Sequence, residues 1–129
     1  MLKTLICIFV GGGLGSVARY AVQLLVHERI TAYSFPWATL SVNIAGSFLI
    51  GLFYALSSRS GLTDEMRLFL TAGLCGGFTT FSTFSNDNLA MLRQGDVATC
   101  MLYIIISVIA GISACFIGGW ICDIIRISE

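Results

Sequence analysis

Four long apolar runs divide this chain, and short polar segments separate them. The runs extend over residues 5–26, 37–58, 66–93 and 97–121. A helix needs about 20 mostly apolar residues to cross a bilayer, and each run has that length. We therefore expect an all-α membrane protein with four transmembrane helices per subunit, built as a single four-span domain over residues 1–129.

The polar segments carry turn and helix-start signals. The only proline, Pro36, ends the loop over residues 27–36, and Trp37 after it is typical of a membrane-interface anchor. Thr63, Asp64 and Glu65 predict a helix start, because acidic residues favour the first turn of a helix. Residues 94–96 then form a very short loop before the last span.

Composition narrows the class of protein further. Hydrophobic residues make up 57% of the 129 residues and charged residues 11%, whereas a soluble domain carries roughly 25% charged residues. A chain this short cannot hide that much apolar surface in its own interior. Seven basic residues balance seven acidic ones, so no basic surface for nucleic acid is expected. These values exclude a soluble enzyme, a disordered segment and a nucleic-acid binder.

Positive residues give only a weak signal for orientation. Four spans place both termini and the loop over residues 58–67 on one side, with four of the Lys and Arg residues: Lys3, Arg59, Arg67 and Arg126. The other side carries two, Arg29 and Arg93. Positive residues set orientation, and this difference is small. Two interpretations stay open: a cytoplasmic N-terminus in every copy, or insertion in both orientations with antiparallel pairing.

The third run is the most unusual part of the chain. Paired glycines, Gly76 and Gly77, precede five hydroxyl residues within residues 79–85, which makes a poor continuous helix. We expect a break near residues 76–80. Freed carbonyls at such a break could hold a cation, and freed N–H groups could favour an anion. A kinked packing helix is the alternative.

The polar residues predicted within the spans are mostly neutral. No span has an Asp, Glu, Lys or His near its middle, which argues against a proton-coupled transporter and suits a passive pathway. Thr39, Asn43 and Ser47 share one face of the second span, and Tyr103, Ser107, Gly111 and Cys115 share one face of the fourth. Hydrogen bonding and close packing between helices would explain the same stripes.

Two further features bear on a pathway for anions. Phe78, Phe81 and Phe84 recur every third residue, and an aromatic ring has a positive edge that can stabilise an anion weakly. We expect the three rings to share one helix face. Arg19 is the only cation well inside a span, where it either snorkels to the interface or sits in a water-filled vestibule that concentrates anions.

These residues resemble one known family. The third span closely resembles the third-span signature of the Fluc (CrcB) fluoride channels, in the run Gly76-Gly77-Phe78-Thr79-Thr80-Phe81-Ser82-Thr83-Phe84-Ser85. The glycine-rich residues 11–15 ahead of Arg19, and residues 39–43, are also similar. The resemblance covers the whole chain in length, span number and motif order, and the third-span motif is specific.

The resemblance implies a function and an assembly. Members are antiparallel dual-topology homodimers, or paired subunits of fixed orientation, with two fluoride pores per dimer in the bacterial inner or plasma membrane. The partners are then fluoride, a second copy and membrane lipid. Passive export of fluoride gives resistance, because hydrogen fluoride enters as a neutral acid and dissociates inside.

The resemblance also implies site residues. Asn43, Phe81 and Phe84 line each pore, and Tyr103, Ser107 and Gly111 follow the polar pathway. Backbone carbonyls of Gly76 and Thr79 hold one structural sodium ion at the dimer centre.

The chain departs from the family pattern in two places. Asp87, after Asn86, stands where relatives usually have Glu, and Gly111 and Cys115 stand where many have a hydroxyl. A neighbouring hydroxyl or water would then replace the lost donors. We expect a fluoride channel and no enzyme. The alternatives are a proton- or sodium-coupled four-span exporter and a structural membrane subunit without transport.

Overall fold

The computed structural model describes residues 1–29, 35–59 and 61–127, the side chains of residues 28, 29, 126 and 127 excepted. Residues 30–34 of the predicted 27–36 loop, and the side chains of Arg29 and Arg126, lie outside the described residues. Within the described part, all regular structure is helical. The all-α prediction is confirmed for these residues.

Three long helices account for three of the predicted spans. They are α1 (Leu2–Arg29), α2 (Trp37–Arg59) and α6 (Val97–Ile127), and each begins or ends slightly beyond its predicted run. Three stretches are long and apolar enough to cross a membrane: Leu2–His27, Trp37–Arg59 and Val97–Ile125. The third run forms shorter helices, none of which meets that criterion in the described part, so its crossing stays a prediction.

The third run consists of four consecutive pieces. A helical column over residues 64–78 contains α3 (Asp64–Leu68), the π-helical segment η1 (Phe69–Cys75) and α4 (Gly76–Phe78). After an interruption comes α5 (Phe81–Arg93). The amide of Gly76 donates to the carbonyl of Thr71, five residues earlier, which is the hydrogen bond of a π-helix. The sequence did not predict this wider segment.

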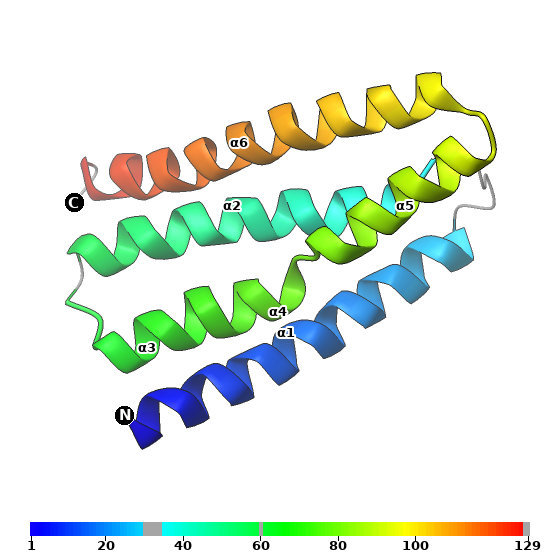
Figure 1. Cartoon of the computed structure of the whole chain (residues 1–129). Coiled ribbons are helices and arrows are strands. Elements are labelled where there is room, and N and C mark those ends of the chain that lie inside the picture. The colour runs from blue at the N-terminus through cyan, green and yellow to red at the C-terminus, as the bar shows by residue number, and fades with distance from the viewer. Residues whose placement is uncertain (30–34, 60, 128–129) are drawn as a thin grey trace.

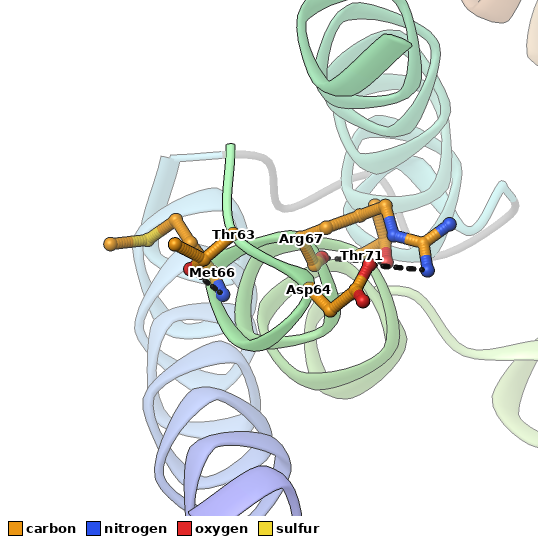
Figure 2. Close-up of polar contacts among 5 residues, drawn as sticks. All are labelled: Thr63, Asp64, Met66, Arg67 and Thr71. Carbon is orange, nitrogen blue, oxygen red and sulfur yellow. Dashed lines mark hydrogen bonds and ion pairs between the residues drawn. The ribbon is translucent and has the colours of Figure 1, made fainter. Parts of the chain in front are cut away.

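The start of α3 follows the sequence signal. The hydroxyl of Thr63 accepts a hydrogen bond from the amide of Met66 at 3.3 Å, and Nη2 of Arg67 lies 3.3 Å from Oδ1 of Asp64 (Figure 2). The Thr71 hydroxyl donates to the Arg67 carbonyl at 2.8 Å, one turn further on. These contacts cap the first turn, so the helix begins where Thr63, Asp64 and Glu65 predict it.

The segments run up and down beside one another. In Figure 1, α2 and α6 lie side by side, α1 lies along the column of α3 and α4, and α5 lies beyond the interruption. The contacts agree, since α2 packs mainly on α6, α1 packs mainly on η1 and α4, and α5 packs mainly on α6. Both termini lie at the same end of the bundle. The interruption between α4 and α5 therefore falls inside the bundle and not at its rim.

Glycines permit close contacts between the helices, and two examples lie at Gly15 and Gly51. A side-chain carbon at Gly15 of α1 would overlap the carbonyl oxygen of Leu74 in η1, and one at Gly51 of α2 would overlap the carbonyl of Cys115 in α6. The backbones touch at these points, as small residues allow between membrane helices. The contact at Gly15 holds η1 against α1, and the contact at Gly51 holds α2 against α6.

Candidate functional site

The interruption lies at two threonines. Thr79 (φ −78°, ψ 157°) and Thr80 (φ −149°, ψ 110°) are extended, whereas Gly76 is helical (φ −62°, ψ −39°) and lies with Gly77 in α4. The non-helical residues are thus the threonines and not the paired glycines. Branching at Cβ favours extended backbone, and the Thr79 hydroxyl donates to the carbonyl of Cys75 at 2.9 Å.

The interruption separates the three phenylalanines. Phe78 ends α4 and Phe81 begins α5, so the prediction that Phe78, Phe81 and Phe84 share one helix face is wrong. Phe81 and Phe84 remain neighbours, with ring centroids 5.7 Å apart. Phe81 is 79% exposed in the single chain, whereas Phe84 is half-buried. The extended pair of threonines gives the two sides of the interruption different directions.

Asn43 pairs with the interrupted backbone. The amide of Thr80 donates to Oδ1 of Asn43 at 2.8 Å, and Nδ2 of Asn43 donates to the carbonyl of Thr80 at 3.1 Å. The side chain thus hydrogen-bonds Thr80 as a neighbouring strand would. In a continuous helix the Thr80 amide would donate to the carbonyl of Gly76. As far as the described residues show, one N–H of Asn43 and the Gly76 carbonyl are left for other partners.

Helix α1 faces the other freed carbonyls. The hydroxyl of Ser16 donates to the carbonyl of Gly77 at 3.4 Å, and Nη1 of Arg19 donates to the carbonyl of Thr79 at 3.5 Å. Both contacts are long. The carbonyl end of a helix is the negative end of its dipole, so a guanidinium is favoured there. The structure places Arg19 beside the interruption, close to one of the two carbonyls predicted to bind sodium.

Hydroxyl groups surround the start of α5. Oγ1 of Thr80 accepts from the amide of Thr83 at 3.2 Å, donates to Oγ1 of Thr83 at 2.9 Å, and lies 3.2 Å from Oγ of Ser82. Thr80 is therefore the N-cap of α5. The predicted site did not include Thr80, although a threonine directly before an apolar residue, here Phe81, is a recognisable cap signal.

A cavity lies beside this interruption. It has a volume of about 260 Å³, is open on one side, and is lined by Asn43, Gly46, Ser47, Ile50, Thr79, Thr80 and Phe81. Its walls therefore combine an amide, hydroxyls and an aromatic ring. It brings together two of the predicted pore residues, Asn43 and Phe81, with one of the predicted carbonyl donors, Thr79.

A second group of predicted residues lies further along α5 and α6. Tyr103 is fully buried, and its hydroxyl donates to Oδ2 of Asp87 at 3.2 Å, with the hydroxyl of Thr39 within reach of both. The ring of Tyr103 lies 5.0 Å from that of Phe84 and 5.5 Å from that of Phe35. Phe84 thus belongs to this covered aromatic cluster, whereas Phe81 faces the cavity.

The polar stripes of α2 and α6 meet in register. Thr39 lies near Tyr103, Ser47 near Gly111 and Gly51 against Cys115, with the same sequence offset each time. A side-chain carbon at Gly111 would lie 3.6 Å from Oγ of Ser47, so a neighbouring hydroxyl does occupy that level. The same register puts Ser107 level with Asn43. The Ser107 hydroxyl is buried and has no hydrogen-bond partner among the described residues.

Known proteins match this chain along almost its whole length. The family model described as "CrcB-like protein, Camphor Resistance (CrcB)" matches residues 6–119. A protein of Bacteroides fragilis named "Fluoride-specific ion channel FluC" is 50% identical over 122 residues, 93% of this chain and 96% of that protein.

Two more distant relatives carry the same name. The Phocaeicola vulgatus protein is 48% identical over 95% of this chain and all of its own length. The Thermus thermophilus protein is 44% identical over 91% of this chain and 93% of its own length. With its three long apolar helices, the chain is a multi-pass protein of a bacterial membrane. The match to the family model and these near-full-length identities show that the chain belongs to the CrcB family.

Proposed function

We propose that this protein is a channel that conducts fluoride passively out of the cytoplasm and so confers fluoride resistance. The observation that carries the proposal is near-full-length similarity to several proteins named fluoride-specific ion channels. The protein belongs to a family of channels, and its function is ion transport and not catalysis. A coupled exporter is not favoured, because none of these relatives is named as one and the cavity walls are uncharged.

The third run would cross the membrane as one interrupted span, completing a single four-span domain over residues 1–129. Irregular backbone at membrane depth is tolerated only where protein or water satisfies it. The pairing of Asn43 with Thr80 and the contacts of Ser16 and Arg19 supply such partners. A purely structural subunit would have no need of an interruption lined by hydroxyls.

The proposed pore residues are Asn43, Phe81, Phe84, Tyr103 and Ser107, with Arg19 in the vestibule. Asn43 keeps one N–H after pairing with Thr80, and the Ser107 hydroxyl, level with it, has no hydrogen-bond partner within the described part of the chain. Phe81 presents an exposed ring whose edge is positive. Neutral donors of this kind suit a compact anion that must bind weakly enough to leave.

The proposed assembly is an antiparallel dual-topology homodimer. A phenylalanine ring that is 79% exposed at an open cavity leaves one wall of a pathway unbuilt in the single chain. A second copy related by a two-fold axis in the membrane plane would supply that wall. Each dimer would then contain two equivalent pathways, and lipid would cover the outer helix faces.

We propose that carbonyls of Gly76 and Thr79 from both subunits hold one sodium ion at the dimer centre. The donors fit a monovalent cation, because the Gly76 carbonyl has lost its helical donor and four neutral oxygens do not suit a divalent hard ion. The guanidinium of Arg19 contacts the Thr79 carbonyl only at 3.5 Å, so the two cations would share this negative end of the column. Elemental analysis of purified dimer should find one sodium per two chains, and its absence would refute the site.

Fluoride efflux from liposomes tests the function. Vesicles that contain only this protein and potassium fluoride should release fluoride to an ion-selective electrode once valinomycin carries the counter-ion. Vesicles loaded with chloride, and protein-free vesicles, serve as controls. Fluoride release without chloride release is the expected result. Equal release of both anions, or no release above the protein-free control, would contradict a fluoride-selective channel.

A further inference from the structure

A buried polar pair joins α5 to α6 next to the aromatic cluster. Asn88 is 8% exposed and Cys100 is 1% exposed. The thiol of Cys100 donates to Oδ1 of Asn88 at 3.2 Å, and Nδ2 of Asn88 donates to the carbonyl of Phe84 at 2.8 Å. One amide therefore links a cysteine of α6 to the backbone of a proposed pore residue, one helical turn earlier on α5.

Helix α5 depends on such contacts for its orientation. The extended residues Thr79 and Thr80 separate it from α4, so no continuous helix fixes its rotation. Two side-chain hydrogen bonds connect it to α6 in the described part of the chain: Asn88 with Cys100, and Asp87 with Tyr103. Adjacent residues of a helix point about 100° apart, so these two bonds together restrict rotation of α5 about its own axis.

The ring of Phe84 follows that rotation. Its centroid lies 5.0 Å from that of Tyr103, and Cys100 and Tyr103 belong to the buried cluster against which Phe84 packs. We propose that Asn88 and Cys100 are positioning residues that hold α5 in the rotation at which the Phe84 ring presents its edge along the fluoride pathway. The proposal rests on the proposed function, since only a pore role makes the ring's direction matter for conduction.

The chemistry of the pair predicts which substitutions keep the position. Serine at residue 100 retains a donor of nearly the same shape, whereas valine removes the donor and leaves the Asn88 oxygen buried without a partner. Replacing both polar groups by apolar ones avoids that unpaired oxygen. The double variant Asn88→Leu with Cys100→Val should therefore still fold, yet it lacks the bond that orients α5.

The experiment reads the ring directly. 4-Fluorophenylalanine replaces Phe84, and the ¹⁹F spectrum of the full-length dimer in lipid nanodiscs is recorded. Cys100→Val and the double variant should shift or broaden the Phe84 signal, and Cys100→Ser should leave it as in the parent. Cys122→Val is the matched control, because Cys122 is also a buried cysteine of α6 but has no such bond to any residue that the structure describes. A probe at exposed Phe9 should not respond to any of these changes.

Flux measured on the same preparations completes the test. We expect Cys100→Val and the double variant to lower fluoride flux about fivefold, and Cys100→Ser to stay within about twofold of the parent. An unchanged Phe84 signal in the folded double variant would overturn the proposal, whatever the flux. If the parent itself carries no fluoride, the proposed function fails, and the ¹⁹F spectra still decide whether the pair positions the ring.

Discussion

At the scale of single residues, Asn43 both hydrogen-bonds the interrupted backbone and lines the cavity beside it. Its amide hydrogen-bonds both backbone groups of Thr80, at 2.8 and 3.1 Å, and in the proposed pore its second N–H would face the transported anion. A backbone N–H or C=O group without a hydrogen-bond partner in hydrocarbon costs several kcal/mol of free energy. The hydrogen bonds of Asn43 avoid that cost at Thr80. The residue that lines the cavity is thus also the residue that permits the interruption.

Asn43→Asp tests both purposes. The carboxylate keeps an acceptor for the Thr80 amide, but it loses the donor to the Thr80 carbonyl and brings negative charge to an anion path. We expect fluoride flux to fall more than tenfold and the unfolding free energy to fall by about 1–3 kcal/mol. Liposome efflux and thermal denaturation measure these effects. Asn86→Asp, the same change at an exposed residue of α5, is the control. Parent-like flux in Asn43→Asp would remove Asn43 from the pathway.

The role of the phenylalanine rings can be tested with substitutions that keep a large apolar side chain. Phe81→Ile and Phe84→Ile keep an apolar side chain but lose the ring quadrupole that a fluoride ion would contact. We expect at least a tenfold loss of fluoride flux in each, with the elution volume in gel filtration unchanged. Phe9→Ile, at an exposed ring of α1, should conduct like the parent. Full flux in both pore variants would show that the ring edges are not used.

At the scale of elements, the interruption depends on a cap and not on glycine flexibility. Thr80 ends one helix direction and begins the next, since its hydroxyl accepts from the Thr83 amide and donates to the Thr83 hydroxyl. Thr80→Ala should cost about 1 kcal/mol of stability and also lower fluoride flux, because α5 then begins at a less defined position. Thr80→Ser keeps the capping hydroxyl, so its stability and its fluoride flux should be close to those of the parent.

A matched cap separates the two effects of Thr80→Ala. Thr63 caps α3 with a similar bond to the Met66 amide but lies exposed at the end of the bundle. Thr63→Ala should lower the melting temperature without lowering the flux per amount of reconstituted protein. Equal loss of flux in both cap variants would mean that flux follows stability alone.

Contact between α1 and η1 is the second feature at this scale. Gly15→Ala would place a methyl group on the Leu74 carbonyl, so α1 must shift, at a cost of about 1–3 kcal/mol. At Gly13, nothing lies within 4 Å of such a methyl group. Gly13→Ala should therefore be neutral or stabilise by up to about 1 kcal/mol through helix propensity. Thermal denaturation of the two variants side by side checks this, and similar melting temperatures would contradict the close contact.

At the scale of the whole molecule, charged residues gather at the two ends of the bundle, apart from Arg19 beside the interruption and Asp87 beside the buried Tyr103. Arg59 pairs with Asp123 and Arg67 with Asp64 at the end that carries both termini. Arg93 lies exposed at the end of α5, beside the turn into α6. Because positive residues set orientation and the two ends differ little, we expect both orientations in one membrane.

Labelling of terminal tags in cells should therefore find them on both sides of the membrane. Arg93→Gln removes one of the few positive charges from its end and should shift the population toward a cytoplasmic N-terminus, whereas Arg93→Lys should not. Tags found on one side only in the parent protein would show a fixed topology and exclude the antiparallel homodimer.

Local signals in the sequence were enough for much of this description. Hydropathy predicted α1, α2 and α6, because a bilayer-length apolar run depends only on neighbouring residues. The acidic start at Thr63 was predicted for the same reason. The third-span motif resembled one family, and the comparisons show that the chain belongs to it. None of these inferences required knowing which helices touch.

The tertiary structure decided what the freed backbone groups and the rings contact. Asn43, 37 residues before Thr80, hydrogen-bonds the extended backbone of Thr80 while the glycines stay helical, because a freed amide pairs with the group that a neighbouring helix places beside it. For the same reason Arg19 points to the Thr79 carbonyl, and Phe81 is exposed while Phe84 is covered. Spacing along a chain gives the face of one helix, but register between helices is set by packing, and that register joins Ser47 to Gly111 and Asn88 to Cys100.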